Sequence, residues 1–137
     1  MARILVVDDN FNHRTLIEQE LTEEGHDVVV TSGGTEAMSY VNKHRPDLVI
    51  TDVAMPRYTG IELIQSIQKH DPTIPIIIYS GYSAYEYTYM AWSVEAFVLK
   101  SGDVSELKKT VNVVMERASN RTLWQAVGGT SNGLYLN

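Results

Sequence analysis

Five short apolar runs recur along the chain, and each is rich in β-branched or aromatic residues. They are Ile4–Val7, Val28–Val30, Leu48–Ile50, Ile76–Tyr79 and Ala96–Leu99. The runs are nearly continuous and do not alternate between apolar and polar residues, which is typical of strands that are buried on both faces. The pattern therefore predicts five strands of a parallel sheet.

The segments between these runs carry apolar residues at helical spacing. The four stripes are Leu16, Ile17 and Leu21; Ala37, Met38 and Val41; Ile61, Ile64 and Ile67; and Val104, Leu107, Val111 and Val114. Strands that alternate with helices form right-handed βαβ units, so the sequence predicts an α/β domain with an open, doubly wound sheet over residues 1–118. Residues 119–137 contain three glycines, three asparagines and no acidic residue, and we interpret them as a C-terminal tail or a truncated linker.

Residues that could bind a ligand or take part in a reaction lie at the ends of four of the five predicted strands. Asp8 and Asp9 follow the first strand, Asp52 follows the third, Ser80 and Gly81 follow the fourth, and Lys100 follows the fifth. The carboxyl ends of parallel strands share one edge, where open α/β folds bind ligands. A single aspartate at a strand end is usually a helix cap and a single lysine is usually a solvated charge, but chance rarely places all of them at one edge.

Three carboxylates that converge on a small space repel one another unless a cation joins them or their pKa values rise. Oxygen ligands favour Mg²⁺, with Mn²⁺ as an alternative. The lysine adds a positive charge, so a phosphoryl group fits this edge and one carboxylate can act as its nucleophile. The histidines show no metal-ligand spacing, and we expect surface or helix-end roles for His13, His26, His44 and His70.

The composition narrows the classes of function. The chain has 137 residues, 44% of them apolar, which suits one domain with a substantial core. Seventeen acidic against 11 basic residues give a net charge of −6, which argues against direct binding of nucleic acid. No apolar stretch reaches the roughly 20 residues of a membrane span. The lack of cysteines and of a signal-peptide pattern leads us to expect a cytoplasmic protein.

Several short motifs together resemble the receiver domain of two-component response regulators. The motifs are Ile4-Leu5-Val6-Val7-Asp8-Asp9, Gly34-x-Glu36-Ala37, Pro46-Asp47-Leu48-Val49-Ile50-x-Asp52, Asp52-x-x-Met55-Pro56-x-x-x-Gly60, Ser80-Gly81 and Phe97-x-x-Lys100. Each is weak alone, but their joint order and spacing are highly specific. The resemblance covers about residues 2–118 and implies a flavodoxin-like five-stranded sheet with the strand order 2-1-3-4-5.

The resemblance also implies how the acidic residues act. Asp52 is then the phosphoacceptor, and Asp9 binds Mg²⁺ directly while Asp8 helps directly or through water. The backbone carbonyl of Ala54 is a further metal ligand. A phosphohistidine on a sensor histidine kinase or a histidine phosphotransfer protein donates the phosphoryl group. The protein is expected to be a signalling switch that assists its own phosphorylation and dephosphorylation, and not a metabolic enzyme.

The same resemblance assigns the other residues of the edge. Lys100 pairs with the phosphoryl group and holds the acidic pocket together when that group is absent. The Ser80 hydroxyl donates to the phosphoryl group, and the N–H groups of Ala54 and Gly81 complete the cradle. Ser80 and Phe97 form the switch, which works by packing alone because Phe97 lacks the hydroxyl of the commoner tyrosine. The family often has a cis proline after the lysine, but Ser101 stands here. A cis non-proline bond costs about 2.5–4 kcal/mol, so we expect a trans Lys100–Ser101 bond.

Aromatic residues are concentrated between the fourth and fifth predicted strands. Tyr85, Tyr89 and Trp92 share one stripe at helical spacing, which either packs on the sheet or forms a partner face. In the family, the positions two residues past the phosphoacceptor and the hydroxyl tune the lifetime of the acyl phosphate. These are Ala54 and Tyr82, and we expect the bulky Tyr82 to obstruct the attacking water and prolong the phosphorylated state.

Two other classes of function remain open at this point. One is a flavodoxin-like domain that binds a cofactor, which the acidic edge disfavours because it repels cofactor phosphates. The other is a receiver-like interaction module that is not phosphorylated. For the leading hypothesis we expect a downstream protein target or an output domain, no membrane association, and a phosphorylation-dependent dimer.

Overall fold

A computed structural model of the protein describes residues 1–53, 60–81, 94–101 and 103–128. Its five parallel strands form one sheet in the order β2-β1-β3-β4-β5. The strands are β1 (Arg3–Val7), β2 (Asp27–Thr31), β3 (Leu48–Thr51), β4 (Ile76–Ser80) and β5 (Ala96–Leu99). The predicted flavodoxin-like strand order is confirmed, and the ranges lie within two residues of the apolar runs.

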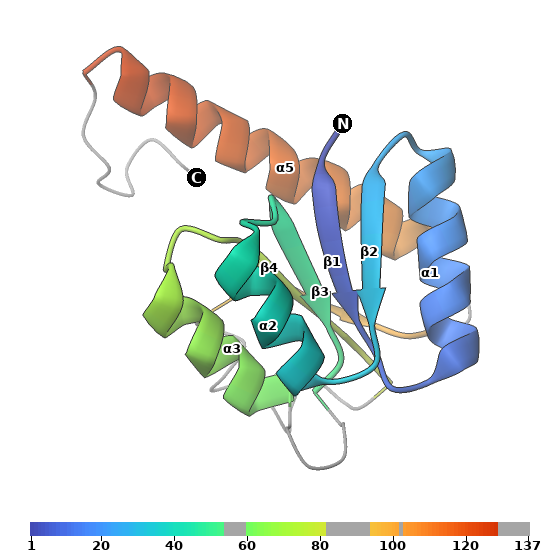
Figure 1. The fold of residues 1–137 in the computed structure, drawn as a ribbon. Coiled ribbons are helices and arrows are strands. Elements are labelled where there is room, and N and C mark those ends of the chain that lie inside the picture. The colour runs from blue at the N-terminus through green and yellow to red at the C-terminus, as the bar shows by residue number, and fades with distance from the viewer. Residues whose placement is uncertain (54–59, 82–93, 102, 129–137) are drawn as a thin grey trace.

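Helices cover both faces of the sheet (Figure 1). They are α1 (Phe11–Glu23), α2 (Gly34–Lys43), α3 (Gly60–His70) and α5 (Ser105–Ala126). Helices α1 and α5 lie on one face, and α2 and α3 lie on the other. The sheet is therefore the middle of three layers, which is the doubly wound arrangement that alternating strands and helices predict.

Both faces of the sheet are buried in apolar cores, which explains why the strand sequences do not alternate. In β1, Ile4 and Val6 pack in the core beneath α1 and α5, whereas Leu5 and Val7 pack in the core beneath α2 and α3. All four side chains are at most 1% exposed. Since successive side chains of a strand point to opposite faces, a strand with two covered faces needs apolar residues at every position.

The strand register brings the carboxyl ends of the strands to one edge. Val7 of β1 pairs with Thr31 and Thr51, and Ser80 of β4 pairs with Leu99. The backbone hydrogen bonds continue one residue past the strands, because the Asp8 N–H donates to the Thr31 carbonyl, the Asp52 N–H to Val7 and the Lys100 N–H to Ser80. The residues that follow the strands are thus held by the sheet itself.

Helix α5 extends beyond the predicted end of the domain at residue 118. It remains helical to Ala126, and Arg121 forms an ion pair of 3.3 Å with Glu95, the residue before β5. The domain boundary at residue 118 stays a prediction, but the first eight residues of the expected tail or linker are part of this helix.

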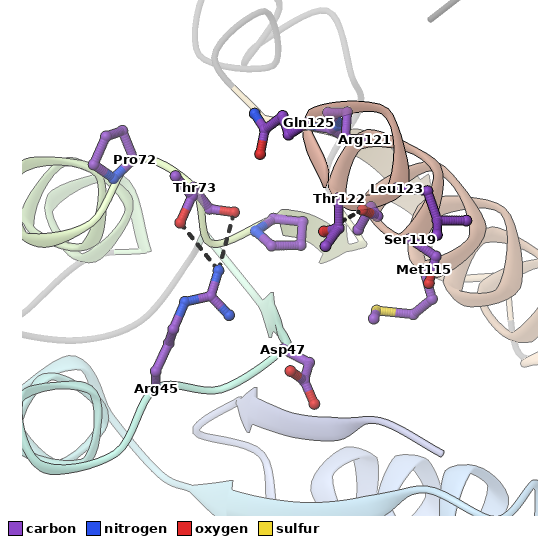
Figure 2. Close-up of a pocket in the computed structure, with 12 residues that line it drawn as sticks. Arg45, Asp47, Pro72, Thr73, Met115, Ser119, Arg121, Thr122, Leu123 and Gln125 are labelled. Carbon is purple, nitrogen blue, oxygen red and sulfur yellow. Dashed lines mark hydrogen bonds between the residues drawn. The ribbon is translucent and has the colours of Figure 1, made fainter. Parts of the chain in front are cut away.

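The extended part of α5 borders a groove of about 790 Å³ at the edge formed by the amino ends of β3 and β4 (Figure 2). Arg45, Asp47 and Thr73 line its other side. Arg45 donates to the backbone carbonyl and hydroxyl of Thr73, so its guanidinium is held by the groove wall. The groove lies at the edge of the sheet opposite Asp8, Asp9 and Asp52. Among the helices of the described part of the chain, none is long and apolar enough to cross a membrane.

The different burial of two leucines of α1 predicts that replacing each by alanine lowers the free energy of unfolding by different amounts. Leu21 is 0% exposed and Leu16 is 42% exposed. We expect Leu21→Ala to lower the free energy of unfolding by about 2–5 kcal/mol, because it leaves a cavity in the core. We expect Leu16→Ala to change it by only about 0.5 kcal/mol. Urea unfolding followed by circular dichroism measures both values, and equal losses would contradict the burial of this helix.

Candidate functional site

Asp8 is the most deeply buried carboxylate of the acidic edge. Its side chain is 2% exposed, and both of its oxygens accept hydrogen bonds. Oδ1 accepts from the Asn10 N–H at 2.9 Å, and Oδ2 accepts from Nζ of Lys100 at 2.6 Å. The helix-cap alternative does not apply to Asp8, since Asn10 caps α1 by accepting from the His13 N–H at 3.0 Å.

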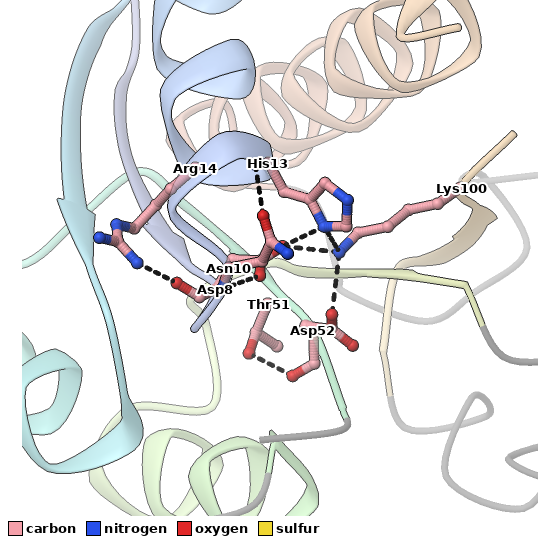
Figure 3. A network of polar contacts seen from close by, with 7 residues as sticks. All are labelled: Asp8, Asn10, His13, Arg14, Thr51, Asp52 and Lys100. Carbon is pink, nitrogen blue, oxygen red and sulfur yellow. Dashed lines mark hydrogen bonds and ion pairs between the residues drawn. The ribbon is translucent and has the colours of Figure 1, made fainter. Parts of the chain in front are cut away.

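Asp52 lies at the end of β3, next to Asp8 in the centre of the site (Figure 3). Its Oδ2 accepts from Nζ of Lys100 at 2.9 Å, and its side chain is 11% exposed. Asp9 is exposed at the rim. Oxygen atoms of Asp8, Asp9 and Asp52 all lie within 4.8 Å of one another. The convergence of three carboxylates, predicted from the strand ends, is confirmed.

Lys100 bridges the two inner carboxylates from the end of β5. Its side chain is only 12% exposed, and burial alone would lower its pKa. The hydrogen bonds that Lys100 donates to Asp8 and Asp52, together with the charges of these carboxylates, outweigh burial and raise the pKa of Lys100 above its ordinary value. The lysine is therefore a fixed positive charge at neutral pH, and the carboxylates stabilise that charge.

The acidic cluster fits a hard divalent cation. It offers only carboxylate oxygens, which are the ligands that Mg²⁺ and Mn²⁺ prefer. Three ionised carboxylates and one ammonium leave an excess of two negative charges, which a divalent cation balances. The outer carboxylate, Asp9, is exposed, so it can bind an ion that keeps several of its waters.

Ser80 and Phe97 lie on neighbouring strands beside this cluster. Ser80 ends β4 and is 0% exposed. Phe97 is partly buried in β5 and packs against the core beneath α2 and α3. Gly81 is exposed, and a Cβ atom added there would meet nothing within 4 Å. The described residues contain no cis peptide bond, so the expected trans geometry of Lys100–Ser101 is confirmed.

Five predicted site residues lie outside the described residues. They are Ala54, Tyr82, Tyr85, Tyr89 and Trp92. The roles of Ala54 as a ligand and cradle residue, of Tyr82 in the phosphoryl lifetime, and of the aromatic stripe as a partner face therefore stay predictions.

The structure adds further residues to the site, among them Asn10, His13 and Gly60. Asn10 begins α1 and holds Asp8 Oδ1, as a helix-cap signature before Phe11 would have indicated. His13 has the expected place near a helix end, but its Nδ1 also lies 3.0 Å from Nζ of Lys100. Gly60 starts α3, where an added Cβ would lie 2.0 Å from the Asp52 carbonyl oxygen.

Gly60 lets α3 approach the backbone of Asp52. The Asp52 carbonyl accepts from the Thr51 hydroxyl at 2.8 Å, and the Gly60 N–H donates to the Val53 carbonyl at 3.2 Å. No side chain fits between these backbones, so glycine is required by close packing and not by an unusual backbone angle. Asp52 and Gly60, the two ends of one sequence motif, thus lie against each other in the structure.

The family of this chain follows from a sequence comparison. The model of the response regulator receiver domain matches residues 4–112. The chain belongs to this family. The receiver domain is 32% identical over 123 residues to a probable transcriptional regulator, ycf27, of Cyanophora paradoxa, with 88% of this chain and 51% of that protein covered. It is 29% identical over 120 residues to sporulation initiation phosphotransferase F of Bacillus subtilis, with 86% and 97% covered.

The receiver domain also resembles solved response regulators. It is 38% identical to TrrA of Thermotoga maritima in complex with Mg²⁺ and BeF, with a TM-score of 0.77 and 82% of this chain and 97% of that chain covered. TrrA in complex with the histidine kinase ThkA matches with the same identity and coverage and a TM-score of 0.76. The chain spans about half the length of the ycf27 relative but nearly all of TrrA and of the Bacillus protein.

The contact at Gly60 predicts a selective loss of stability in the receiver domain. We expect Gly60→Ala to lower the free energy of unfolding by about 3 kcal/mol, because the new methyl group overlaps the Asp52 carbonyl and forces the backbones apart. Gly33→Ala, at the start of α2, is the matched control, since a Cβ there meets nothing within 4 Å. The control should lose less than about 1 kcal/mol. Urea unfolding in which both variants lose the same amount would contradict the close approach.

Proposed function

We propose that this receiver domain accepts a phosphoryl group on Asp52 from a phosphohistidine donor, in a reaction that requires Mg²⁺ or Mn²⁺. One observation supports this most strongly. A buried lysine joins two of three converging carboxylates, at distances of 2.6 Å and 2.9 Å. A site for structure alone would not gather three like charges at one edge, since they repel one another.

The side chains have separate parts in the transfer. A carboxylate oxygen of Asp52 forms the new bond to phosphorus as the bond to the donor nitrogen breaks, and the electron pair of that bond stays on the histidine. Lys100 screens the charge of the phosphoryl oxygens, and the Ser80 hydroxyl donates to one of them. The N–H groups of Ala54 and Gly81 complete the cradle. A divalent cation held by Asp8, Asp9, Asp52 and the Ala54 carbonyl supplies further charge screening when it is bound.

The same transfer sets the proposed switch. Ser80 lies at the buried end of β4, and Phe97 is partly buried in the neighbouring β5. A hydroxyl drawn towards the phosphoryl group leaves room behind it, and an aromatic side chain that turns into this room changes the surface of the domain. Tyr82 restricts the attack of water on the acyl phosphate, so the switched state is comparatively long-lived. Tyr85, Tyr89 and Trp92 are the proposed partner face.

The surface beside the site suits a protein donor. Phe11 and Leu16 of α1 are large apolar residues that are 68% and 42% exposed. Leu16 also lines a hollow of about 70 Å³ that reaches His13 and Lys100 of the site. A helix that carries a phosphohistidine can pack on these apolar side chains while its imidazole reaches Asp52. TrrA in complex with ThkA supports a sensor histidine kinase, or a histidine phosphotransfer protein, as the donor.

The remaining parts of the proposal concern the whole protein. Residues 1–118 form the receiver unit, and residues 119–137 are a tail or a linker to an output module. The output acts through a downstream protein target or that module, with a phosphorylation-dependent dimer, in the cytoplasm. The receiver acts as a switch that assists its own phosphorylation and dephosphorylation, and this chain binds no nucleic acid directly.

The decisive test is chemical modification of Asp52. Incubation with Mg²⁺ and acetyl phosphate should add one phosphoryl group, because the site supplies nucleophile and charge screening itself. Intact-mass spectrometry measures the addition. Asp52→Asn should abolish it, whereas Asp27→Asn, at an exposed carboxylate in an ion pair with Arg3, should leave it unchanged. Equal modification of wild type and Asp52→Asn, or no modification at all, would remove the proposal in favour of an interaction module or a cofactor-binding domain.

The cation site predicts stabilisation by Mg²⁺. At a concentration about ten times Kd, Mg²⁺ should raise Tm by about 3–6 °C, since it binds the folded state only. Asp9→Asn should reduce this shift, because it removes one carboxylate without disturbing the buried pair of Asp8 and Lys100. Differential scanning calorimetry with Mg²⁺ and with Na⁺ at equal ionic strength measures the specific effect. The same shift in both salts would argue against the site.

A further inference from the structure

Lys100 has a third partner in addition to the two carboxylates. Its Nζ lies 3.0 Å from Nδ1 of His13, on the first turn of α1 (Figure 3). An ammonium group carries three N–H donors and no acceptor. The two carboxylates and the imidazole therefore match all three donors, and Nδ1 of His13 must be the acceptor, because a protonated Nδ1 would face another donor.

His13 lies within hydrogen-bond distance of Lys100 and not of Asp8. Its Nδ1 lies 3.8 Å from Asp8 Oδ2, which is longer than a hydrogen bond. With Nδ1 accepting, the ring proton is on Nε2 and the imidazole is neutral. His13 thus differs from the two carboxylates, since it holds the ammonium without adding a charge to the acidic cluster.

The start of α1 fixes the backbone of this histidine. The Asn10 side chain accepts from the His13 N–H at 3.0 Å, and the Asn10 N–H donates to Asp8 Oδ1 at 2.9 Å. Asn10 therefore connects the backbone of His13 to Asp8, the carboxylate that also contacts Lys100. His13 is 49% exposed, so its side chain can be replaced without opening the core.

The third partner matters when Asp8 takes part in cation binding. Both oxygens of Asp8 already accept hydrogen bonds, from Asn10 and from Lys100. A cation that binds Oδ2 repels the ammonium that lies 2.6 Å from the same oxygen, so the two positive charges compete for Asp8. Without His13, the lysine that releases Asp8 would keep one hydrogen-bond acceptor among the described side chains, Asp52, besides the face of the Tyr79 ring 5.6 Å away. With His13 it keeps two.

We propose that His13 is a positioning residue that holds the Lys100 ammonium beside Asp52 and so lets Asp8 exchange the lysine for a divalent cation. The inference rests on the proposed function, because it concerns the same cation site. It predicts that the hydrogen-bond acceptor at position 13, and not the ring or its charge, supports binding of Mg²⁺.

Two variants of similar size separate these properties. His13→Leu removes the acceptor, and His13→Asn places an amide oxygen near the position of Nδ1. Isothermal titration calorimetry with MgCl₂ at pH 8, where histidine side chains are ordinarily neutral, measures Kd. We expect His13→Leu to raise Kd roughly tenfold and His13→Asn to restore most of the affinity. An unchanged or lower Kd in His13→Leu, or equal losses in both variants, would overturn the proposal.

A double-mutant cycle shows whether the effect passes through Lys100. In a Lys100→Met background, His13→Leu should leave the Kd for Mg²⁺ unchanged, because no ammonium remains to be held. An equal loss in both backgrounds would mean that His13 acts on the cation or on Asp8 directly, and would also overturn the proposal. Circular dichroism verifies that each variant folds. If Lys100→Met does not fold, the comparison of the leucine and asparagine variants decides.

A spectroscopic readout is independent of both cation binding and phosphorylation. Nitrogen-15 NMR of the imidazole at pH 8 should show the Nε2–H tautomer for His13, and an Nδ1–H tautomer would contradict the contact with Lys100. The proposed function can fail separately. If Asp52 is not phosphorylated but His13→Leu still weakens Mg²⁺ binding through Lys100, the positioning role stands and only the phosphoryl transfer is lost.

Discussion

The ammonium of Lys100 is the group on which the acidic site depends. Asp8 is 2% exposed, and an ionised carboxylate buried to this extent costs several kcal/mol unless an opposite charge and hydrogen bonds compensate it. Asp52 lies beside it and would add repulsion. Lys100 donates a hydrogen bond to each carboxylate and balances part of their charge, although it is 92 residues from Asp8 and 48 residues from Asp52 in the sequence. The site therefore exists only when β1, β3 and β5 lie in one sheet.

The sheet holds these groups because both of its faces are buried. Each strand lies between an apolar core beneath α1 and α5 and another beneath α2 and α3. The hydrogen bonds of the ladder extend to Asp8, Asp52 and Lys100 themselves. The contact between Gly60 and the Asp52 carbonyl adds a second restraint from α3. A receiver domain of this kind can keep like charges close together because rigid backbone sets the spacing of their side chains.

The sheet and most of the side chains at its carboxyl edge were predictable from the sequence. Apolar runs such as Ile4–Val7 indicated strands with two buried faces, and the joint motifs implied the strand order. The residues after the strands indicated which side chains meet at the acidic edge. The role of Gly60 was not predictable in this way, because it depends on how closely α3 approaches the backbone of β3. The contact between His13 and Lys100 is not predictable for a similar reason, since their separation in the sequence carries no periodic signal.

By itself, the sequence determined the α/β class, the parallel sheet and the set of acidic, hydroxyl and lysine groups at its carboxyl edge. These features depend on local periodicity and on the rule that parallel strands end at one edge. Only the tertiary structure decided which oxygen of Asp8 contacts the lysine, at what distances the lysine joins the two inner carboxylates, and that Nδ1 of His13 lies within hydrogen-bond distance of the same ammonium. Such contacts depend on ångström-scale packing between distant elements, and no pattern of neighbouring residues encodes them.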